Sequence, residues 1–343
     1  MSSRILVVIF SLLMIACPKK GEQSQVDFFI DEPSLQKDLE VLTESPHPFG
    51  SDRQKFISEY LLKRASLFSS HSKIQSFESK VPNPTLLGVD ESKVGMRSLT
   101  LTKKGRNIYS FADVSKGNDC VVILGSHYDT KTIPGLDYVG ANDSGSSSAL
   151  LIQMLKFLKE KKSKTKYHCD LLLVWFDGEE AVLDDWDDGE DNHPAKLQDN
   201  TYGSRYFVSH ATESCSKGRC LTSDLGGHWI KAFILVDMIG SPDLKISDDQ
   251  NSHPALRRQL RENLNARGLK GMISRYPRQV ADDHIPFKQV GIPALNIIDF
   301  ENLGFWHRGG DTPDNLSNKS IQLSGLLVFE IFSQLAESPK PIR

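Results

Sequence analysis

The chain has 343 residues, of which 39% are hydrophobic and 25% are charged, and a globular chain of this length can form one large domain or two small ones. Its 41 basic and 44 acidic residues give a formal net charge of -3. Nucleic-acid binding needs clustered lysine and arginine side chains against phosphate, so this balance excludes a nucleic acid from the expected partners.

Residues 1–17 have the pattern of an export signal. Arg4 precedes a mostly apolar stretch from Ile5 to Ala16, and Cys17 follows a small residue. This stretch is shorter than the ~20 residues that span a bilayer, and "MIAC" resembles the site at which bacterial lipoproteins are lipidated on cysteine. Lipidation of Cys17 and cleavage of a plain signal peptide both stay open. In both cases we expect the mature chain, 18–343, to work outside the cytoplasm, with membrane contact only through the lipid.

Four cysteines follow in the expected mature chain, in a compartment where disulfides persist. Cys215 and Cys220 flank the loop-like segment "SKGR" and can close a small ring. Cys120 and Cys169 each begin an apolar, strand-like run, so they can pair only if these two strands are neighbours. Buried free thiols are the alternative for this second pair.

The apolar residues predict helices that alternate with buried strands. Helical spacing is found in five segments: 33–45, 52–68, 147–162, 253–268 and 320–337. Near-continuous apolar runs with β-branched residues, typical of strands covered on both faces, are found at 120–129, 170–180, 229–240 and 291–300. This alternation predicts a three-layer α/β/α sandwich with a central mixed, mostly parallel sheet. Since no repeat or long linker divides residues 18–343, we expect a single domain.

The predicted strands end in acidic side chains and histidine. The residues concerned are His127, Asp129, Asp177, Glu179, Glu180, Asp237 and Asp299, and His307 follows the last strand. Ligand sites of open α/β sheets lie beyond the carboxyl ends of the strands. We therefore expect these side chains to converge on one crevice that binds a cation.

The residue types in this crevice favour zinc. Imidazole and carboxylate without thiolate suit an open catalytic zinc site better than a calcium or magnesium site, and they are offered by His127, Asp143, Glu180, Asp237 and His307. The sequence separations between them are too long for a local metal-binding motif, so the fold must assemble the site. If Glu180 binds the ion, the adjacent Glu179 is left beside a Lewis acid as a general base or acid.

Some neighbouring residues are expected to support the site or to have no part in it. Asp129 lies two residues after His127, at a spacing that suits a partner orienting the imidazole. The acid-rich stretch 184–191 lacks the spacing of a calcium loop, so we expect a solvated surface insert there. We expect His284 to be a packed structural histidine.

Several ordered motifs resemble those of the zinc aminopeptidase superfamily and, more narrowly, of its glutaminyl cyclase (glutaminyl-peptide cyclotransferase) branch. They are "GSHYDT", "VGANDSGSSSALL", "FDGEEAVL", "YGSRYF", "VDMIG", "DDHIPF" and "FWHRGGDTPDN". The resemblance to the branch depends on "FDGEEA", the insert before "YGSR", "DDHIPF" and the Trp306–His307 pair. One departure is Asn296, which stands where glutaminyl cyclases often have a histidine.

This resemblance implies a single zinc-dependent catalytic domain over 18–343 and a defined ligand set. Asp143, Glu180 and His307 are expected to bind one zinc ion. In the two-metal aminopeptidases the position of His127 holds a ligand of a second zinc, with Asp143 bridging and Asp237 completing that site.

The resemblance also implies roles for residues around the metal. Glu179 is expected to be the proton shuttle, with Asp237 and Asp282 in a carboxylate network around it. Trp306 and Trp186 are expected to wall the substrate pocket.

The implied activity is a zinc-dependent acyl transfer on peptide or protein N-termini. An N-terminal glutamine is converted to pyroglutamate, ammonia is released, and Glu179 carries the proton. The alternative is a two-zinc aminopeptidase that hydrolyses the first peptide bond with a metal-activated water. A catalytically inactive binding domain of the same fold is the third hypothesis, which the filled ligand positions disfavour.

Overall fold

The computed structural model describes residues 27–90, 93, 95, 98–116, 120–161, 167–215 and 218–342. The predicted signal segment and Cys17 lie outside the described residues. Among the helices within these ranges, none combines the length and apolar character needed to cross a bilayer.

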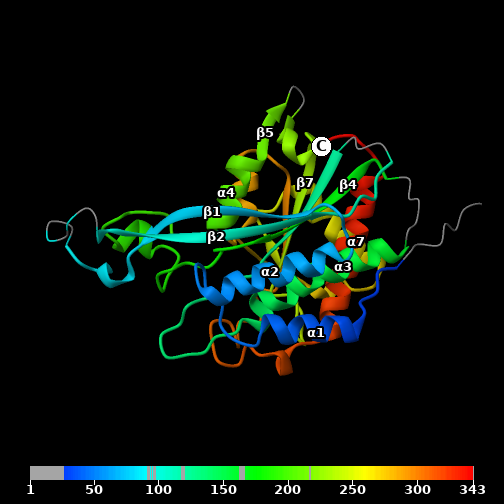
Figure 1. Ribbon diagram of the computed structural model, residues 1–343. Helices are drawn as coiled ribbons and strands as arrows, with labels where there is room; N and C mark the ends of the chain where they lie inside the picture. The colour runs from blue at the N-terminus through cyan, green and yellow to red at the C-terminus, as the bar shows by residue number, and fades with distance from the viewer. Residues whose placement is uncertain are drawn as a thin grey trace, which may run out of the picture.

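A mixed sheet of eight described strands forms the centre of the molecule (Figure 1). The strands are β1 (Ser72–Pro82), β2 (Thr100–Phe111), β3 (Cys120–His127), β4 (Cys169–Phe176), β5 (Thr212–Cys215), β6 (Gly218–Leu221), β7 (Trp229–Asp237) and β10 (Ala294–Ile298). Their order is β1-β2-β4-β3-β7-β6-β5, and β10 also pairs with β7. The neighbours β4, β3, β7 and β10 run parallel, as the apolar runs predict.

Helices cover both faces of this sheet. Their bounds are α1 (Glu32–Leu42), α2 (Asp52–Ser66), α3 (Ser147–Lys161), α4 (Tyr202–Ala211), α5 (Pro254–Ala266), α6 (His284–Gln289) and α7 (Asn318–Ala336). Buried side chains of α1, α2, α3, α5 and α7 pack in one core with Val122 and Leu124 of β3. Those of α4 and α6 pack in a second core with Val121 and Ile123. Because successive strand residues point to opposite faces, the continuous apolar runs supply both cores, and the predicted three-layer sandwich is confirmed.

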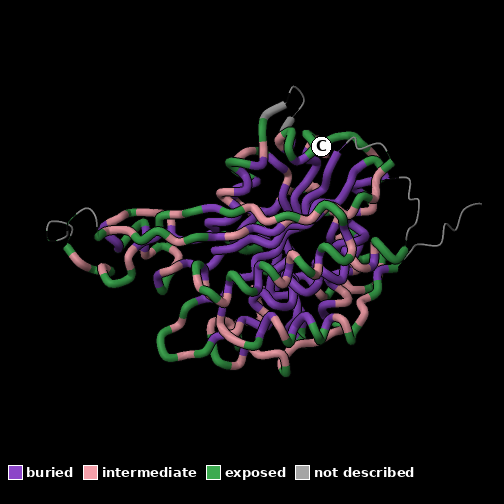
Figure 2. Tube along the Cα trace, viewed as in Figure 1, coloured by how far each residue is buried: buried purple, intermediate pink, exposed green. Residues whose placement is uncertain are grey.

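The predicted and observed elements differ mainly at the polar edges of the sheet. All five predicted helices are present, with ends that differ by at most three residues. The central strands are buried along their whole length (Figure 2), whereas β1 and β2 form a long antiparallel pair with many half-exposed residues that extends beyond the body of the molecule (Figure 1). A search for continuous apolar runs therefore missed β1 and β2, and it also missed α4 and α6.

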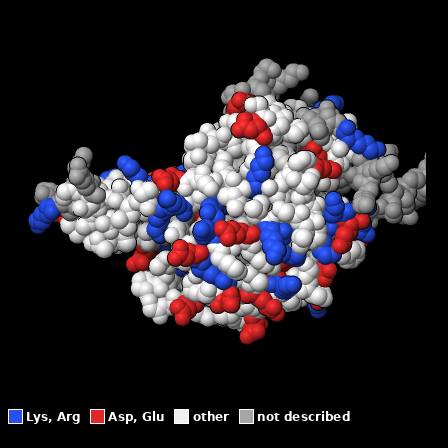
Figure 3. Space-filling view, viewed as in Figure 1, with Lys and Arg blue, Asp and Glu red and all other residues white. Residues whose placement is uncertain are grey.

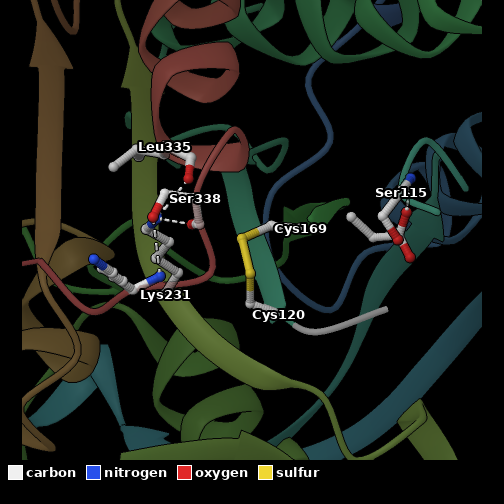
Figure 4. Close-up of a disulfide and its surroundings, with 8 residues drawn as sticks. Ser115, Cys120, Cys169, Lys231, Leu335 and Ser338 are labelled. Carbon is white, nitrogen blue, oxygen red and sulfur yellow. Dashed lines mark hydrogen bonds between the residues drawn. A yellow bond between two sulfur atoms is a disulfide. The ribbon is translucent and has the colours of Figure 1, made fainter. Parts of the chain in front are cut away.

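The start of the parallel strands is closed by a disulfide. Cys120 and Cys169 are register partners in the neighbouring strands β3 and β4, and their sulfur atoms are bonded (Figure 4). The condition set by the sequence, that the two strands be neighbours, is thus met. Cys220 is also disulfide-bonded, while the side chain of Cys215 lies outside the described part of the structure. The bonded cysteines of β3 and β4 lie at the opposite end of these strands from His127.

The remaining elements are a small parallel pair and the charged surface. β8 (Ile246–Asp249) pairs with β9 (Ile273–Arg278) beside the main sheet. On the face seen in Figure 3, basic and acidic side chains are interspersed, in keeping with the nearly balanced composition.

Candidate metal centre and adjoining cavity

Acidic and histidine side chains meet beyond the carboxyl ends of the parallel strands. His127 is the last residue of β3 and Asp237 the last residue of β7. Glu179 and Glu180 follow the end of β4, and Asp143 lies in the irregular turn Ala141–Ser146 that leads into α3. His307 comes from the loop after β10 and has a left-handed backbone conformation, with φ of 53°. The fold therefore collects the site from five separate segments.

One group of potential ligands consists of Asp143, Glu180 and His307. Each offers one ligand atom, and these atoms all lie within 4.8 Å of one another. His307 Nε2 is 3.3 Å from Glu180 Oε1 and 3.5 Å from Asp143 Oδ2. Both carboxylates are buried, and the histidine is partly exposed. The three residues expected to grip one ion are thus brought together.

A second group shares Asp143 and adds His127 and Asp237. Its ligand atoms also lie within 4.8 Å of one another. His127 Nε2 is 3.1 Å from Asp143 Oδ1 and 3.4 Å from Asp237 Oδ1. Asp143 therefore presents one carboxylate oxygen to each group, which is the geometry of a bridging ligand.

The donor set fits a metal ion. Isolated buried carboxylates are unfavourable unless they are paired or coordinate a cation, and the group of Asp143, Glu180 and His307 combines two carboxylates with one imidazole. In the second group, Oδ1 of Asp237 is buried and makes no hydrogen bond. Carboxylate and imidazole are ligand types that divalent metals take in catalytic sites.

Asp311 holds the turn that carries Asp143. Its carboxylate accepts hydrogen bonds from the backbone N–H of Asn142 at 2.6 Å and of Asp143 at 3.2 Å. The Tyr138 hydroxyl lies 3.0 Å from Asp311 Oδ2 and 3.2 Å from Asp143 Oδ2. Burial and the charge of Asp143 raise the pKa of Asp311 to about 6. Asp311 belongs to the quoted motif "FWHRGGDTPDN", but sequence reasoning gave it no role.

Asp129 lies beside His127 and supports the adjacent glutamates. Its Oδ1 lies 3.6 Å from His127 Nδ1, which is beyond hydrogen-bond distance, so its role in orienting the imidazole stays a prediction. Its two carboxylate oxygens also accept the backbone N–H groups of Glu179, at 3.0 Å, and Glu180, at 3.3 Å. One buried carboxylate thus fixes the backbone from which both glutamate side chains leave.

The adjacent carboxylates of Glu179 and Glu180 face different partners. Glu180 is directed at His307, whereas Glu179 Oε2 lies 3.8 Å from His127 Nε2. Burial raises the pKa of Glu179 well above its usual value; the nearby His127 opposes this, and Asp282 adds to it. Adjacent residues in the chain therefore have separate environments.

The pKa values of the acids around Glu179 are also shifted. Burial raises the pKa of Asp237 to about 6, and burial together with the charge of Asp237 raises the pKa of Asp282 to about 7. Asp143 behaves oppositely: burial favours its neutral form, but hydrogen bonds with His127 and His307 hold its pKa below the usual range. For His307, burial is outweighed by Asp143 and Glu180, so its pKa rises to about 10.

A cavity of about 190 Å³ adjoins this centre. Its walls are formed by Asp143, Glu179, Glu180, Trp186, Asp237, Met238, Gln279, Val280, Ala281, Asp282, Ile298, Phe300, Trp306 and His307. Trp306 stacks on His307 with ring centroids 4.2 Å apart and meets Phe300 edge-on at 5.4 Å. Trp186 and Trp306 thus lie at the cavity, where sequence reasoning expected them, whereas Phe300 and Gln279 were not singled out.

Other singled-out residues lie away from the cavity. Asp177 accepts the backbone N–H of Arg106 at 2.7 Å, and Asp299 accepts that of Lys245 at 3.0 Å, so the expectation that every strand-end acid converges was wrong for these two. Their carboxylates satisfy the backbone of neighbouring segments instead.

Two residues of the "DDHIPF" region and its surroundings also have defined partners. His284 is buried with Nε2 3.1 Å from Asp249, as expected of a packed histidine. Asn296, at the position where the resemblance leads us to expect a histidine, donates from Nδ2 to Asp282 Oδ2 at 2.9 Å. Asn296 thus reaches the carboxylate network without itself being able to carry a charge.

Comparisons with known proteins agree with this geometry. The sequence pattern of peptidase family M28 matches residues 110–332. A glutaminyl-peptide cyclotransferase of Dictyostelium discoideum is 28% identical over 244 residues, which are 65% of this chain and 62% of that protein. The chain thus spans less than two thirds of that relative's length.

Solved structures show the same likeness. The crystal structure of an Acidobacteriales bacterium glutaminyl cyclase has a TM-score of 0.72 at 26% identity, covering 94% of this chain and 99% of that one. A Zn-dependent exopeptidase from Parabacteroides distasonis has a TM-score of 0.65 at 17% identity, covering 92% and 100%, and this likeness shows the fold alone. The expected resemblance to the zinc aminopeptidase superfamily and its glutaminyl cyclase branch is confirmed.

Proposed function

The chain belongs to peptidase family M28, and from this we propose that it is a zinc-dependent glutaminyl-peptide cyclotransferase that converts the N-terminal glutamine of peptides into pyroglutamate. The observation that carries the proposal is the joint placement of Asp143, Glu180 and His307 beside the buried Glu179 at one cavity. The likeness to glutaminyl-peptide cyclotransferases supports the choice of reaction.

Asp143, Glu180 and His307 would hold the zinc ion. Their two carboxylates and one imidazole leave an open position of the kind that catalytic zinc sites keep. Bound there, zinc supplies a Lewis acid for the side-chain carbonyl of the substrate glutamine. Asp311 and Tyr138 hold Asp143 in place, and Asp129 fixes the backbone of Glu180.

Glu179 moves the proton. It lines the cavity, and burial raises its pKa well above the usual value, which makes it a stronger proton acceptor than an exposed glutamate. In the cyclisation, the substrate α-amine forms a bond to the side-chain carbonyl carbon, and the bond from that carbon to the amide nitrogen breaks. Glu179 accepts a proton from the attacking amine and gives it to the departing ammonia.

The cavity walls fit a reaction that consumes no water. Trp306 and Phe300 present a packed aromatic surface beside His307, and Trp186 and Ile298 also line the cavity. The apolar part of this wall limits the access of water, which could otherwise hydrolyse the side-chain amide of the substrate.

The alternative function, a zinc aminopeptidase, is favoured by one specific observation. His127, Asp143 and Asp237 form a second potential metal group that shares Asp143 with the first. Two metal ions at these groups suit the hydrolysis of an N-terminal peptide bond.

Product analysis separates the two functions. Purified residues 18–343 are loaded with zinc and incubated with Gln-initiated and Leu-initiated peptides, while product masses and zinc content are followed. Ammonia loss from the first peptide, with the second intact and one zinc per chain, supports the cyclotransferase. Release of free leucine by a protein with two zinc ions establishes the aminopeptidase instead, and metal binding with neither product leaves a binding domain.

We also propose that the mature protein is extracytoplasmic and carries a lipid on Cys17. The support is the pattern of Arg4, the apolar stretch and "MIAC". Metabolic labelling with a radioactive fatty acid should mark the full-length protein and not its Cys17→Ala variant. If the wild-type protein is instead secreted without label and without the signal segment, residues 1–17 act as a plain cleaved signal peptide.

A further inference from the structure

The segment from Glu179 to Leu183, here called the shuttle loop, has no regular secondary structure although it is largely buried. Its residues belong to no helix or strand, and Glu179, Glu180, Ala181 and Leu183 are each at most 5% exposed. Buried backbone N–H and C=O groups need hydrogen-bond partners. Since the shuttle loop makes no ladder, its partners must come from other parts of the chain.

Two buried carboxylates bind four N–H groups of the shuttle loop. Asp129 accepts from Glu179 and Glu180 at the start of the loop. Asp199 accepts from Val182 at 2.9 Å and from Leu183 at 2.7 Å. Hydrogen bonds to an ionised carboxylate are stronger than neutral ones, so both ends of the loop are firmly held on their donor side.

A buried lysine binds the acceptor side of the same loop. The ammonium of Lys131 donates to the carbonyl of Ala181 at 2.7 Å and to that of Leu183 at 2.6 Å, and Lys131 is only 4% exposed. A lysine is rarely buried to this extent unless it is paired. The backbone of Leu183 is thus bound twice: its C=O accepts from Lys131, and its N–H donates to Asp199.

The shuttle loop joins the two parts of the site that need a fixed position. Glu179, at its start, lies beside His127, and Trp186, three residues after its end, lines the cavity. The carbonyl of Glu179 also accepts the backbone N–H of Thr201 at 2.8 Å. Movement of Ala181 and Leu183 would therefore displace the proton carrier and the aromatic wall together.

We propose that Lys131 is a positioning residue: by binding the carbonyls of Ala181 and Leu183 it fixes the shuttle loop, and through it Glu179 and Trp186. This inference rests on the proposed function for its effect on turnover. Lys131 itself belongs neither to the potential metal groups nor to the residues that line the cavity in the described structure. Its effect is on geometry, and misplacement of a reacting group by about 1 Å can reduce a rate by ~100-fold.

The test compares Lys131→Met with Lys231→Met. Methionine keeps a long apolar side chain and removes the ammonium donors. Lys231 is a matched control because it is also 4% exposed and its ammonium also binds two backbone carbonyls, those of Leu335 at 2.5 Å and of Ser338, near the start of β7 and away from the shuttle loop. Both variants are loaded with zinc, and kcat on a Gln-initiated peptide is measured together with amide hydrogen exchange.

We expect Lys131→Met to keep one zinc per chain, to lose kcat by at least about tenfold, and to exchange the amides of residues 181–187 at least about tenfold faster, with β4 unchanged. Lys231→Met should keep kcat within about twofold and exchange residues 181–187 as the wild type does. Wild-type kcat and wild-type exchange in Lys131→Met, or equal losses in both variants, overturn the proposal.

Two further experiments cover the cases in which the variant does not fold or the wild type shows no activity. If Lys131→Met does not fold, Asp199→Asn is tested instead, because it weakens the hydrogen bonds to the N–H groups of Val182 and Leu183. It should give the same local pattern of faster amide exchange. Unchanged exchange overturns the proposal. If the wild type releases no ammonia from any Gln-initiated peptide, the proposed function fails, while the exchange of residues 181–187 still tests the role of Lys131.

Discussion

Asp282→Asn should make the metal-free protein more stable at neutral pH. Burial and the charge of Asp237 raise the folded-state pKa of Asp282 from 3.8 to about 7. The folded chain therefore binds this proton more tightly than the unfolded chain does. The resulting stability is fully present below the unfolded pKa and is lost as the pH rises through about 7.

The size of this effect follows from the two pKa values. Each pH unit between them corresponds to about 1.4 kcal/mol, so the ionisation of Asp282 should lower the free energy of unfolding on the order of 4 kcal/mol between pH 4 and 8. Asparagine cannot ionise and fits the same contacts. The N–H of Asp283 donates to Oδ1 at 2.6 Å, and the Asn296 amide, whose Oδ1 has no hydrogen-bond partner, can turn to accept from the new NH2.

Equilibrium urea unfolding of chelator-treated protein at pH 4 and pH 8 measures this difference. Both proteins contain Glu179 and Asp237, so the difference between wild type and Asp282→Asn reports the ionisation of Asp282 together with its coupling to these two acids. We expect the variant to be the more stable protein at pH 8 and to show the smaller change between the two pH values. Equal changes in the two proteins would refute the reasoning that burial holds Asp282 in its neutral form.

Three further predictions concern the metal and the cavity. Glu179→Gln should retain zinc and lose turnover by at least about 100-fold, whereas Glu180→Ala should lose the metal. Zinc analysis and ammonia release check both variants. An active Glu179→Gln protein would show that Glu179 is not the proton carrier. Asp311→Asn should weaken zinc binding by about 10- to 100-fold, measured by competition with a chelator, because Asp311 fixes Asp143; unchanged affinity would show that the turn holds without it. Trp306→Leu should raise KM by up to about tenfold, since aromatic contacts contribute ~0.5–1.5 kcal/mol, with zinc content unchanged; an unaltered KM would place the substrate elsewhere.

The centre of the fold could be predicted because its strands are buried on both faces. Such strands read as continuous apolar runs, and the runs that became β3, β4, β7 and β10 were recognised. Because ligand sites lie beyond the carboxyl ends of such strands, the ends also pointed to His127, Glu179 and Asp237. Asp143 and His307 were candidate ligands by residue type, but their assignment with Glu180 to one ion depended on the resemblance to a family, since each comes from a loop.

The supporting residues could not be predicted from local patterns. Asp311 holds the backbone of Asp143 from 168 residues further along the chain, and Lys131 and Asp199 meet at the shuttle loop from opposite directions in the sequence. Such residues satisfy backbone groups that become buried only when the fold is complete. An aspartate or lysine in a predicted loop is usually solvated, so these contacts could not be recognised before the fold was known.

The most direct test of the account is to locate the metal. Anomalous diffraction at the zinc absorption edge, recorded from crystals of the zinc-loaded protein, should show a strong peak within about 2.0–2.2 Å of ligand atoms of Asp143, Glu180 and His307. A zinc ion bound only by His127 and Asp237, or no zinc at the three expected ligands, would contradict the account.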